Sequence, residues 1–497
     1  MRLVGLWLLA LSAAAIGQYP GAQPVPRQWK VGFDSIREAD ARELVGILAG
    51  PDFQGRSPRS FGYAAAAGFV ASKLRELGLK PGGDDGSFFN HFTLVESTLD
   101  PAGTKLTLPT GKTFTWGTEF RCGAPNAAKG EVSVAYVCIP EGSDPSKLDL
   151  GQLKGKWLVT DVHASHRPFW QKVQQNKRFY GYLGFVSVSA EPLERVSNPG
   201  RINVVKDTAD PRITPISSLS ITKAIADEIA TSSGASNYLS ASRTSASIEV
   251  AKPCQVETAV TLGAELRSAN VVAILEGSDP SLRGEYVLYG SHLDHMGVRG
   301  GQTYWGADDN ASGCTANLMM ARAFVRNTVK PRRSVIFAFY SLEEEGTHGS
   351  WAMMSRPPVP ADKIVANINM DMLGRNEEGR GEDPTKNTKM VYPGSVKLNS
   401  MDFYNLLVRM NSHVGLELRD DKEDRTDRSD TRNTVVFGIP TLKVFTGEHP
   451  DYHRPGDTPD KINYPKLTNI AKWLYLTGQE LASQEARPRF EPRPWGG

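Results

Sequence analysis

The sequence predicts an α/β fold: a largely parallel central sheet, covered by helices on both faces, with a smaller β-rich domain inserted into it. From Ala269 onward, continuous apolar runs alternate with helix-like segments, which is typical of a parallel sheet buried on both faces. From about Gly130 to Val250, short β-type runs are separated by Gly, Pro, Asp and Ser. The length of 497 residues also exceeds that of one ordinary domain.

The order of these patterns gives a domain plan. In residues 35–79, apolar side chains recur three and four positions apart, which predicts two amphipathic helices joined by the turn segment FQGRSPRSFG. We therefore expect the large domain to comprise residues 30–120 and 259–483, with the inserted domain at 121–258. The remaining tail, 484–497, lacks apolar periodicity and is expected to be disordered.

The N-terminus has the pattern of an export signal. A positive charge at Arg2 precedes a short apolar segment, and small residues and prolines follow, so residues 1–17 are interpreted as a signal peptide. Retention of this segment as an anchor stays open. Later in the chain no apolar run is long enough to span a bilayer, and we expect a secreted or periplasmic protein with no membrane span after signal cleavage.

Charge and cysteine content exclude some classes of partner and scaffold. A formal charge of +2 gives no indication of nucleic-acid binding. Four cysteines are too few for a disulfide scaffold, although export would permit one bridge, and we expect Cys254 to pair with Cys122 or Cys138. Cys314 lies among small residues and is interpreted as core. The oligomeric state stays open.

Polar side chains gather where the predicted strands end. In YGSHLDHMG a strand leads to His292, a candidate metal ligand, and Asp294 would accept the second ring N–H of that histidine. In GADDNASG, Asp309 stands directly before a helix-like run, where Asp308 or Asn310 could instead cap the helix. Adjacent carboxylates repel each other unless a cation offsets them, which favours a metal here.

Three further motifs extend the set. SVIFAFYSLEEEG ends a buried strand in consecutive glutamates, so Glu344 could bind metal while Glu343 faces a water as general base. NINMDMLG surrounds Asp371 with methionines, where an unpaired carboxylate would be costly. DYHRPGDT supplies His453, with Asp457 as an orienting partner. Taken singly, each motif also suits a structural role: a hydrogen-bonded histidine, a helix cap or a solvated acidic turn.

Together the motifs predict a metal centre. Two histidines and several carboxylates at the ends of strands in one sheet form a nitrogen and oxygen donor set that suits zinc or a similar divalent ion. Five protein ligands with one shared carboxylate would hold two ions at the roughly 3.5–4 Å separation of paired hydrolytic sites. The residues therefore indicate two-metal hydrolysis.

With these motifs in the same order and spacing, the chain resembles the secreted zinc aminopeptidases with two co-catalytic ions. That broad group also includes proteins similar to glutamate carboxypeptidase and to the transferrin receptor. The resemblance covers about Ser35 to Pro101 and Ala269 to Ser483 and implies a phosphorylase/hydrolase-like fold. GKWLVTD and GYLGFVSVS make the insertion similar to a protease-associated domain.

The resemblance implies a role for each residue. His292 and Asp371 would bind one Zn²⁺, Glu344 and His453 the other, and Asp309 would bridge the two. Glu343 resembles the general base and Asp294 the residue that orients a ligand. Tyr452 matches a tyrosine that helps to polarise the scissile carbonyl in some members.

The expected activity is removal of N-terminal residues from peptide substrates. A dipeptidase or carboxypeptidase stays open as an alternative, as do, further away, a glutaminyl cyclase and a receptor-like protein without catalysis. The loop from Met296 to Trp305 could line a specificity pocket or be a solvated glycine-rich loop. In RSDTRNT, Thr431 and Arg432 depart from the pattern of the resembling Ser-Asp segment, which puts the role of that segment in doubt.

Overall fold

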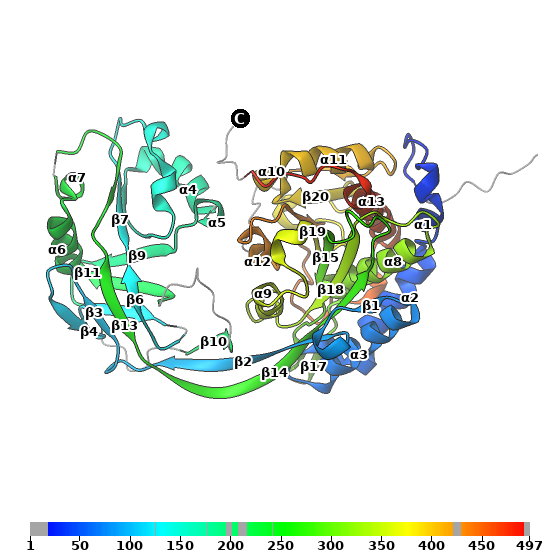
Figure 1. The fold of residues 1–497 in the computed structure, drawn as a ribbon, viewed down its shortest axis with the longest axis horizontal. Helices are drawn as coiled ribbons and strands as arrows, with labels where there is room; N and C mark the ends of the chain where they lie inside the picture. The colour runs from blue at the N-terminus through cyan, green and yellow to red at the C-terminus, as the bar shows by residue number, and fades with distance from the viewer. Residues whose placement is uncertain are drawn as a thin grey trace, which may run out of the picture.

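The fold is taken from a computed structural model, which describes residues 18–124, 126–175, 177–194, 201–206, 216–240, 242–420 and 429–491. The expected signal peptide at 1–17 lies outside these residues. Figure 1 shows a larger lobe and a smaller lobe, joined by the long strands β2 (Phe89–Leu99) and β14 (Val260–Leu275).

The larger lobe contains a ten-stranded sheet in the order β10-β2-β14-β18-β15-β19-β22-β20-β21, with β1 also paired to β14. The bounds not yet given are β1 (Lys80–Pro81), β10 (Arg201–Val205), β15 (Tyr286–His292), β18 (Ser334–Tyr340), β19 (Ile364–Met370), β20 (Met390–Gly394), β21 (Glu417–Leu418) and β22 (Thr441–Phe445).

The centre of this sheet is parallel and its flanks are mixed. β18, β15, β19 and β22 run parallel to one another, whereas β14 pairs antiparallel with β18, and β20 antiparallel with β22. The predicted α/β fold with a central sheet flanked by helices is confirmed. Parallel neighbours need a crossover connection, usually a helix, whereas antiparallel neighbours do not. The central strands, which helices cover, are therefore the parallel ones.

Side chains of one central strand alternate between two apolar cores. Val287 and Tyr289 of β15 belong to one core, while Leu288 belongs to the other together with Ile336 of β18. Successive residues of a strand face opposite sides of the sheet, so helices must cover both. On the first side lie α2 (Glu38–Leu48), α3 (Phe61–Glu76), α8 (Gly313–Arg326), α11 (Met401–Asn411) and α13 (Tyr464–Ser483); on the second lie α9 (His348–Ser355) and α12 (Thr431–Val435).

Two amphipathic helices were expected over 35–79, and α2 and α3 occupy that region. Two shorter helices complete the larger lobe, α1 (Lys30–Asp34) and α10 (Val396–Asn399). A small hairpin, β16 (Gly297–Arg299) and β17 (Gln302–Tyr304), stands between the HLDH and GADDNASG motifs. The Met296 to Trp305 loop is therefore ordered as a hairpin.

The smaller lobe contains two further sheets. A six-stranded sheet has the order β12-β7-β8-β9-β11-β5 and a four-stranded sheet the order β4-β3-β13-β6. The strands are β3 (Lys105–Thr107), β4 (Thr113–Thr115), β5 (Phe120–Gly123), β6 (Ala128–Val132), β7 (Val134–Ile139), β8 (Trp157–Val162), β9 (Gly184–Ser189), β11 (Ser218–Thr222), β12 (Ser247–Val250) and β13 (Cys254–Thr258), and the helices are α4 (Arg167–Gln175), α5 (Lys177–Tyr180), α6 (Lys223–Ser233) and α7 (Ser236–Leu239).

The structure moves one expected boundary. We placed residues 30–120 in the larger domain, but β3 and β4 pair with β13 in the smaller lobe. Conversely, β10 lies within the expected insertion yet pairs with β2 at the edge of the larger sheet. Short strands carry too little periodicity to show which sheet they join, because long-range pairing decides it.

Two other expectations are corrected. Residues 484–491 of the expected disordered tail pack on the larger lobe, where Arg487 pairs with Glu285 and Arg489 with Asp402. Pro488 is buried there as well, and residues 492–497 lie outside the described part. All four cysteines are free and buried, so the expected bridge to Cys254 is absent.

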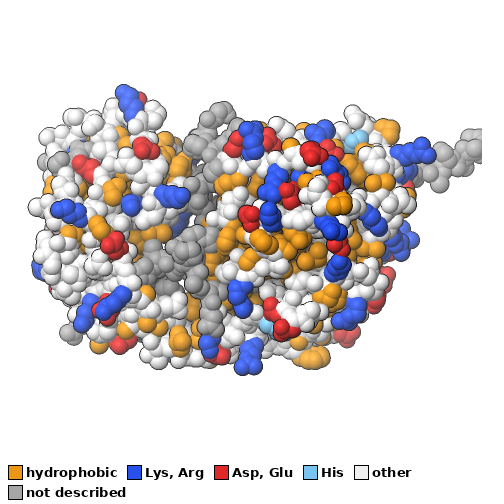
Figure 2. All heavy atoms as spheres, in the orientation of Figure 1, with side chains coloured by type: hydrophobic (Ala, Val, Ile, Leu, Met, Phe, Trp, Pro, Cys, Tyr) orange, Lys and Arg blue, Asp and Glu red, His pale blue; other side chains and the backbone are white. Residues whose placement is uncertain are grey.

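The surface in view (Figure 2) carries charges of both signs, in agreement with the balanced formal charge. On the face in Figure 2, basic and acidic side chains are interspersed and do not separate by sign. Among the described residues, no helix is both long and apolar enough to cross a membrane.

Candidate functional site

The predicted ligands meet at one edge of the sheet. His292 is the last residue of β15, Glu343 and Glu344 follow β18, and Asp371 follows β19. His453 lies in the loop after β22. The carboxyl ends of parallel strands share one edge of a sheet, which brings together side chains that are far apart in sequence.

Asp309 stands at the centre of this cluster. It lies in the turn Ala307–Ser312 that leads into α8, and only 3% of its surface is exposed. Its Oδ1 is 3.3 Å from His292 Nε2, and its Oδ2 is 3.1 Å from His453 Nε2. The two oxygens of one carboxylate thus face two separate imidazoles.

The first group comprises His292, Asp309 and Asp371. Asp371 Oδ1 is 3.3 Å from His292 Nε2, and its Oδ2 accepts a 2.7 Å hydrogen bond from Ser429 Oγ. The Ser-Asp segment therefore orients a candidate ligand through its serine. Burial lowers the pKa of His292, but Glu343, Asp309 and Asp371 outweigh it and hold the pKa well above its usual value.

The second group comprises Asp309, Glu344 and His453, together with His295. Glu344 Oε2 is 3.0 Å from His453 Nε2, and Glu344 Oε1 is 2.6 Å from His295 Nδ1. His295 Nδ1 is also 3.7 Å from Asp309 Oδ2. Potential ligand atoms of His295, Asp309 and Glu344 all lie within 4.8 Å of one another.

This arrangement fits divalent ions. Buried carboxylates at such separations repel each other unless positive charge lies among them. The carboxylates of Glu343, Asp309 and Asp371 raise the pKa of His292, as expected where negative charge gathers. Imidazole nitrogens and carboxylate oxygens are the donors that zinc takes.

Glu343 differs from its neighbour Glu344. Its backbone N–H donates to Asp294 Oδ1 at 3.1 Å, whereas its carboxylate has no hydrogen-bond partner among the described residues. Burial raises the pKa of Glu343 well above its usual value, and the charges of Asp430 and Asp371 add to the effect. A carboxyl group with a raised pKa and no protein partner is suited to take up and release a proton.

Asp294 has a different contact from the expected one. His292 Nδ1 is 3.2 Å from the backbone oxygen of Asp294 but 3.9 Å from its carboxylate. The carboxylate instead accepts the backbone N–H groups of Glu343 and Glu344, at 3.1 and 3.3 Å. Asp294 thus orients the glutamate loop with its side chain and the histidine with its main chain.

Several side chains hold the GADDNASG loop. Asp457 was expected to orient His453, but its carboxylate accepts the backbone N–H groups of Asp308 and Asp309, each at 3.0 Å. Asn310 Oδ1 accepts the N–H of Gly313 at the start of α8, as expected of a cap, and Asn310 Nδ2 donates to Met370 O. Asp308 accepts the N–H of Gly374 instead of capping α8. These bonds fix Asp309 against the Asp371 loop.

Left-handed backbone occurs beside several candidate ligands. Leu342 precedes Glu343 with φ 57°, Met372 follows Asp371 with φ 58°, and His453 itself has φ 53°. Such conformations are uncommon away from glycine and cost about 1–3 kcal/mol each. They turn the side chains at the strand ends toward the cluster.

Tyr452 lies at the mouth of the cluster. Its side chain is 39% exposed, and its ring stacks on that of His453 with centroids 3.9 Å apart. Burial of its inner part raises the pKa of Tyr452, and nearby carboxylates add to the shift. The hydroxyl therefore stays protonated and able to donate.

Two residues at the site were missed from the sequence. His295, the second histidine of HLDH, lies against Glu344. Arg56 is fully buried, and it donates to the carbonyl groups of Leu293 and Gly306 in the two ligand loops. The second histidine of HLDH could have indicated His295 as a residue of the site. Nothing in the sequence indicated Arg56, which is a single arginine in a turn segment.

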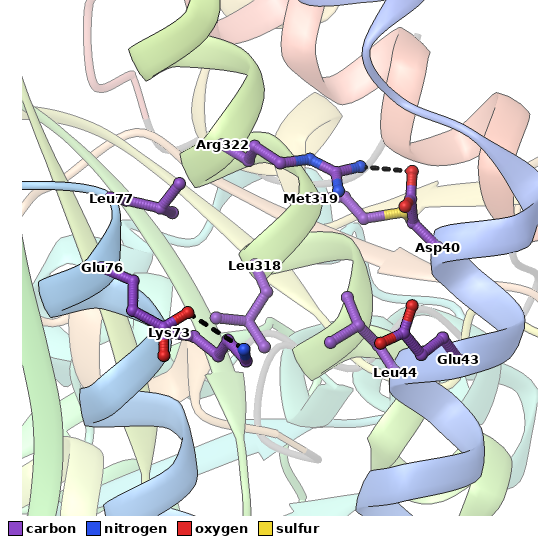
Figure 3. Close-up of a pocket in the computed structure, with 9 residues that line it drawn as sticks. All are labelled: Asp40, Glu43, Leu44, Lys73, Glu76, Leu77, Leu318, Met319 and Arg322. Carbon is purple, nitrogen blue, oxygen red and sulfur yellow. Dashed lines mark hydrogen bonds and ion pairs between the residues drawn. The ribbon is translucent and has the colours of Figure 1, made fainter.

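A separate crevice of about 200 Å³ lies between α2, α3 and α8 (Figure 3). Arg322 donates to Asp40 there, and Lys73 pairs with Glu76. Its charges are thus mostly satisfied within the protein, and no candidate ligand lines it.

Comparison with known proteins points to one family. Residues 270–477 match the sequence model of peptidase family M28. A probable leucine aminopeptidase of Trichophyton verrucosum is 27% identical over 228 residues, which cover 43% of this chain and 57% of that protein. The leupeptin-inactivating enzyme 1 of Streptomyces exfoliatus is 29% identical over 182 residues, 36% of each chain. The chain thus spans about half or less of the length of these relatives.

Among solved structures, the chain is similar to an aminopeptidase of Aneurinibacillus sp. strain AM-1, with a TM-score of 0.46 and 18% identity over 94% of this chain and 98% of the other. A zinc aminopeptidase of Bacillus subtilis gives a TM-score of 0.47 and 15% identity over 90% and 96%.

Proposed function

Residues 270–477 form a peptidase family M28 domain, and from this premise we propose that the chain is a two-zinc aminopeptidase that removes N-terminal residues from peptides. The observation that carries the proposal is the placement of Asp309, whose two oxygens face His292 and His453 separately. A carboxylate with this placement is suited to bridge two ions.

The residues that would hold the ions divide into two sets. His292 and Asp371 would hold one zinc, Glu344 and His453 the other, and Asp309 would be shared between them. Bound zinc lowers the pKa of a water molecule and polarises a carbonyl group. Asp294 keeps the loop of Glu343 and Glu344 in place through its carboxylate.

Glu343 would act as the proton carrier. Its carboxylate takes a proton from the attacking water and then gives it to the departing amine, so it ends each cycle in its starting form. The absence of a hydrogen-bond partner for this carboxylate within the described residues supports the role. Tyr452, exposed at the mouth with a protonated hydroxyl, would donate a hydrogen bond to the scissile carbonyl.

The choice of aminopeptidase over dipeptidase or carboxypeptidase is supported by the names of the curated relatives, several of which are probable leucine aminopeptidases. We also propose that the chain is exported with its first 17 residues as the signal, and that the smaller lobe is a protease-associated-like domain near the substrate entrance. A glutaminyl cyclase or a receptor without catalysis would not need the full ligand set.

The test is Glu343→Gln. Zinc content, measured by mass spectrometry of the purified protein, should stay near two per chain, while hydrolysis of leucine nitroanilide should fall by about 10²–10⁴-fold, the usual contribution of a general base. Retained hydrolysis would contradict the role of Glu343. A wild-type content of one zinc would contradict the two-ion site.

A substrate panel separates the classes of exopeptidase. Aminoacyl nitroanilides with a free amine should be cleaved, and the same compounds with an acetylated amine should not. Cleavage of the acetylated compounds, or only of substrates with a free C-terminus, would overturn the assignment as an aminopeptidase.

A further inference from the structure

The ring of His295 is fixed in one orientation. Its side chain is fully buried, and its backbone N–H donates to Arg56 O at 3.2 Å. Gly306 packs against the ring so closely that an added Cβ would lie 2.5 Å from a ring carbon. On the other side, Nδ1 is 2.6 Å from Glu344 Oε1. Little space is left for the imidazole to rotate.

The contact between His295 and Glu344 defines the proton position. An ionised carboxylate has no donor, so the proton of this hydrogen bond belongs to His295 Nδ1. The bond occupies Glu344 Oε1, while the other oxygen, Oε2, is 3.0 Å from His453 Nε2. The two oxygens of Glu344 therefore have different partners.

The distances favour a supporting contact over direct ligation by His295. His453 Nε2 lies 3.1 Å from Asp309 Oδ2 and 3.0 Å from Glu344 Oε2, so it faces both carboxylates of the second group. His295 Nδ1 is 3.7 Å from Asp309 and at hydrogen-bond distance from Glu344 alone.

We infer that His295 is a positioning residue that holds Glu344 as a one-oxygen ligand by binding Oε1 and leaving Oε2 free for zinc. The inference rests on the proposed two-zinc site and deepens it. Partners that orient a metal ligand in this way typically contribute 10–100-fold to metal affinity. Only the ion on the Glu344 side should depend on His295, because no hydrogen bond or ion pair joins its ring to His292 or Asp371 among the described residues.

The test compares His295→Leu with His295→Asn. The asparagine amide nitrogen takes nearly the same place as Nδ1 and can donate to Glu344, but it is a poor zinc ligand, whereas leucine fills similar volume and donates nothing. His348→Asn is the matched control, since His348 is a half-buried histidine near the same loop, and among the described residues its ring makes no hydrogen bond or ion pair with the cluster. Zinc-loaded full-length proteins are titrated with a chromophoric chelator, which removes the two zinc ions in two steps. His453→Asn lacks a ligand on the Glu344 side, so the step that it loses belongs to that ion.

His453→Asn should abolish one of the two release steps. In His295→Leu the zinc affinity measured in that same step should fall by about 10–100-fold, while the other step stays unchanged. In His295→Asn both steps should stay close to wild type. Equal loss in the leucine and asparagine variants would show that His295 is a direct ligand and overturn the inference. Unchanged release, or equal weakening of both steps, would overturn it as well. Wild-type protein with a single release step would instead contradict the two-zinc site itself.

Discussion

Replacing Arg56 with methionine should destabilise the fold at its metal-ligand loops. The guanidinium is fully buried and donates to four backbone carbonyl groups. Nε donates to Leu293 O at 2.8 Å, Nη1 to Leu48 O at 2.7 Å and Trp305 O at 2.9 Å, and Nη2 to Gly306 O at 2.8 Å. One side chain thus ties the end of α2 to both loops that carry ligands.

The size of the effect follows from these bonds. Gly306 O keeps the N–H of Ala311 as a donor, so three carbonyls would be left without one. Each costs about 1–3 kcal/mol, and the three together about 3–9 kcal/mol. Removing the buried charge recovers part of this cost. Burial lowers the pKa of Arg56, which shows that the charged form is costly here, and the negative charges of Asp309 and Asp457 offset that cost only in part. We therefore expect a loss of about 4 kcal/mol, a large part of the ~5–15 kcal/mol of a typical domain.

The matched control is Arg59→Met in the same segment. Arg59 makes a bidentate ion pair with Glu345, but its side chain is 54% exposed, and exposed pairs contribute about 0–1 kcal/mol. Urea unfolding of both variants, followed by tryptophan fluorescence, gives the comparison. If the Arg56 and Arg59 variants lose similar free energies of unfolding, the reasoning about buried carbonyls is wrong.

Two further predictions concern Lys466 and Tyr452. Burial lowers the pKa of Lys466 to about 7, against about 10.4 for an ordinary lysine. Between about pH 7 and 10.4 the unfolded chain therefore binds more protons than the folded one, and the free energy of unfolding should rise with pH. Urea midpoints at pH 7 and 9.5 should show a smaller rise in Lys466→Met, and parallel pH curves would contradict this. Tyr452→Phe keeps the stack on His453 but removes the hydroxyl, and should lower kcat by about 10²-fold with zinc content unchanged; an unchanged kcat would exclude the proposed hydrogen bond.

Periodicity was sufficient for the fold class because long apolar strands and amphipathic helices are local patterns. The strand ends then placed His292, Asp371 and the glutamate pair at one edge. The same patterns could not place β3, β4 and β10, since a strand of three to five residues joins a sheet through partners far away in sequence. The order of the tail could not be predicted for a similar reason, because Arg489 pairs with Asp402, which is distant along the chain.

Within the motifs, sequence did not show which polar residue does what, and the reason is the backbone. In GADDNASG the neighbours Asp308, Asp309 and Asn310 have three different contacts: an amide of the Asp371 loop, the imidazoles, and the start of α8. Strand and helix periods assign side-chain directions only where φ and ψ repeat. These residues lie in an irregular turn, so periodicity could not assign their directions. Only the resemblance indicated Asp309, and long-range contacts fix the direction of each side chain. Asp457 shows the same point, since it orients amides and not the nearby histidine.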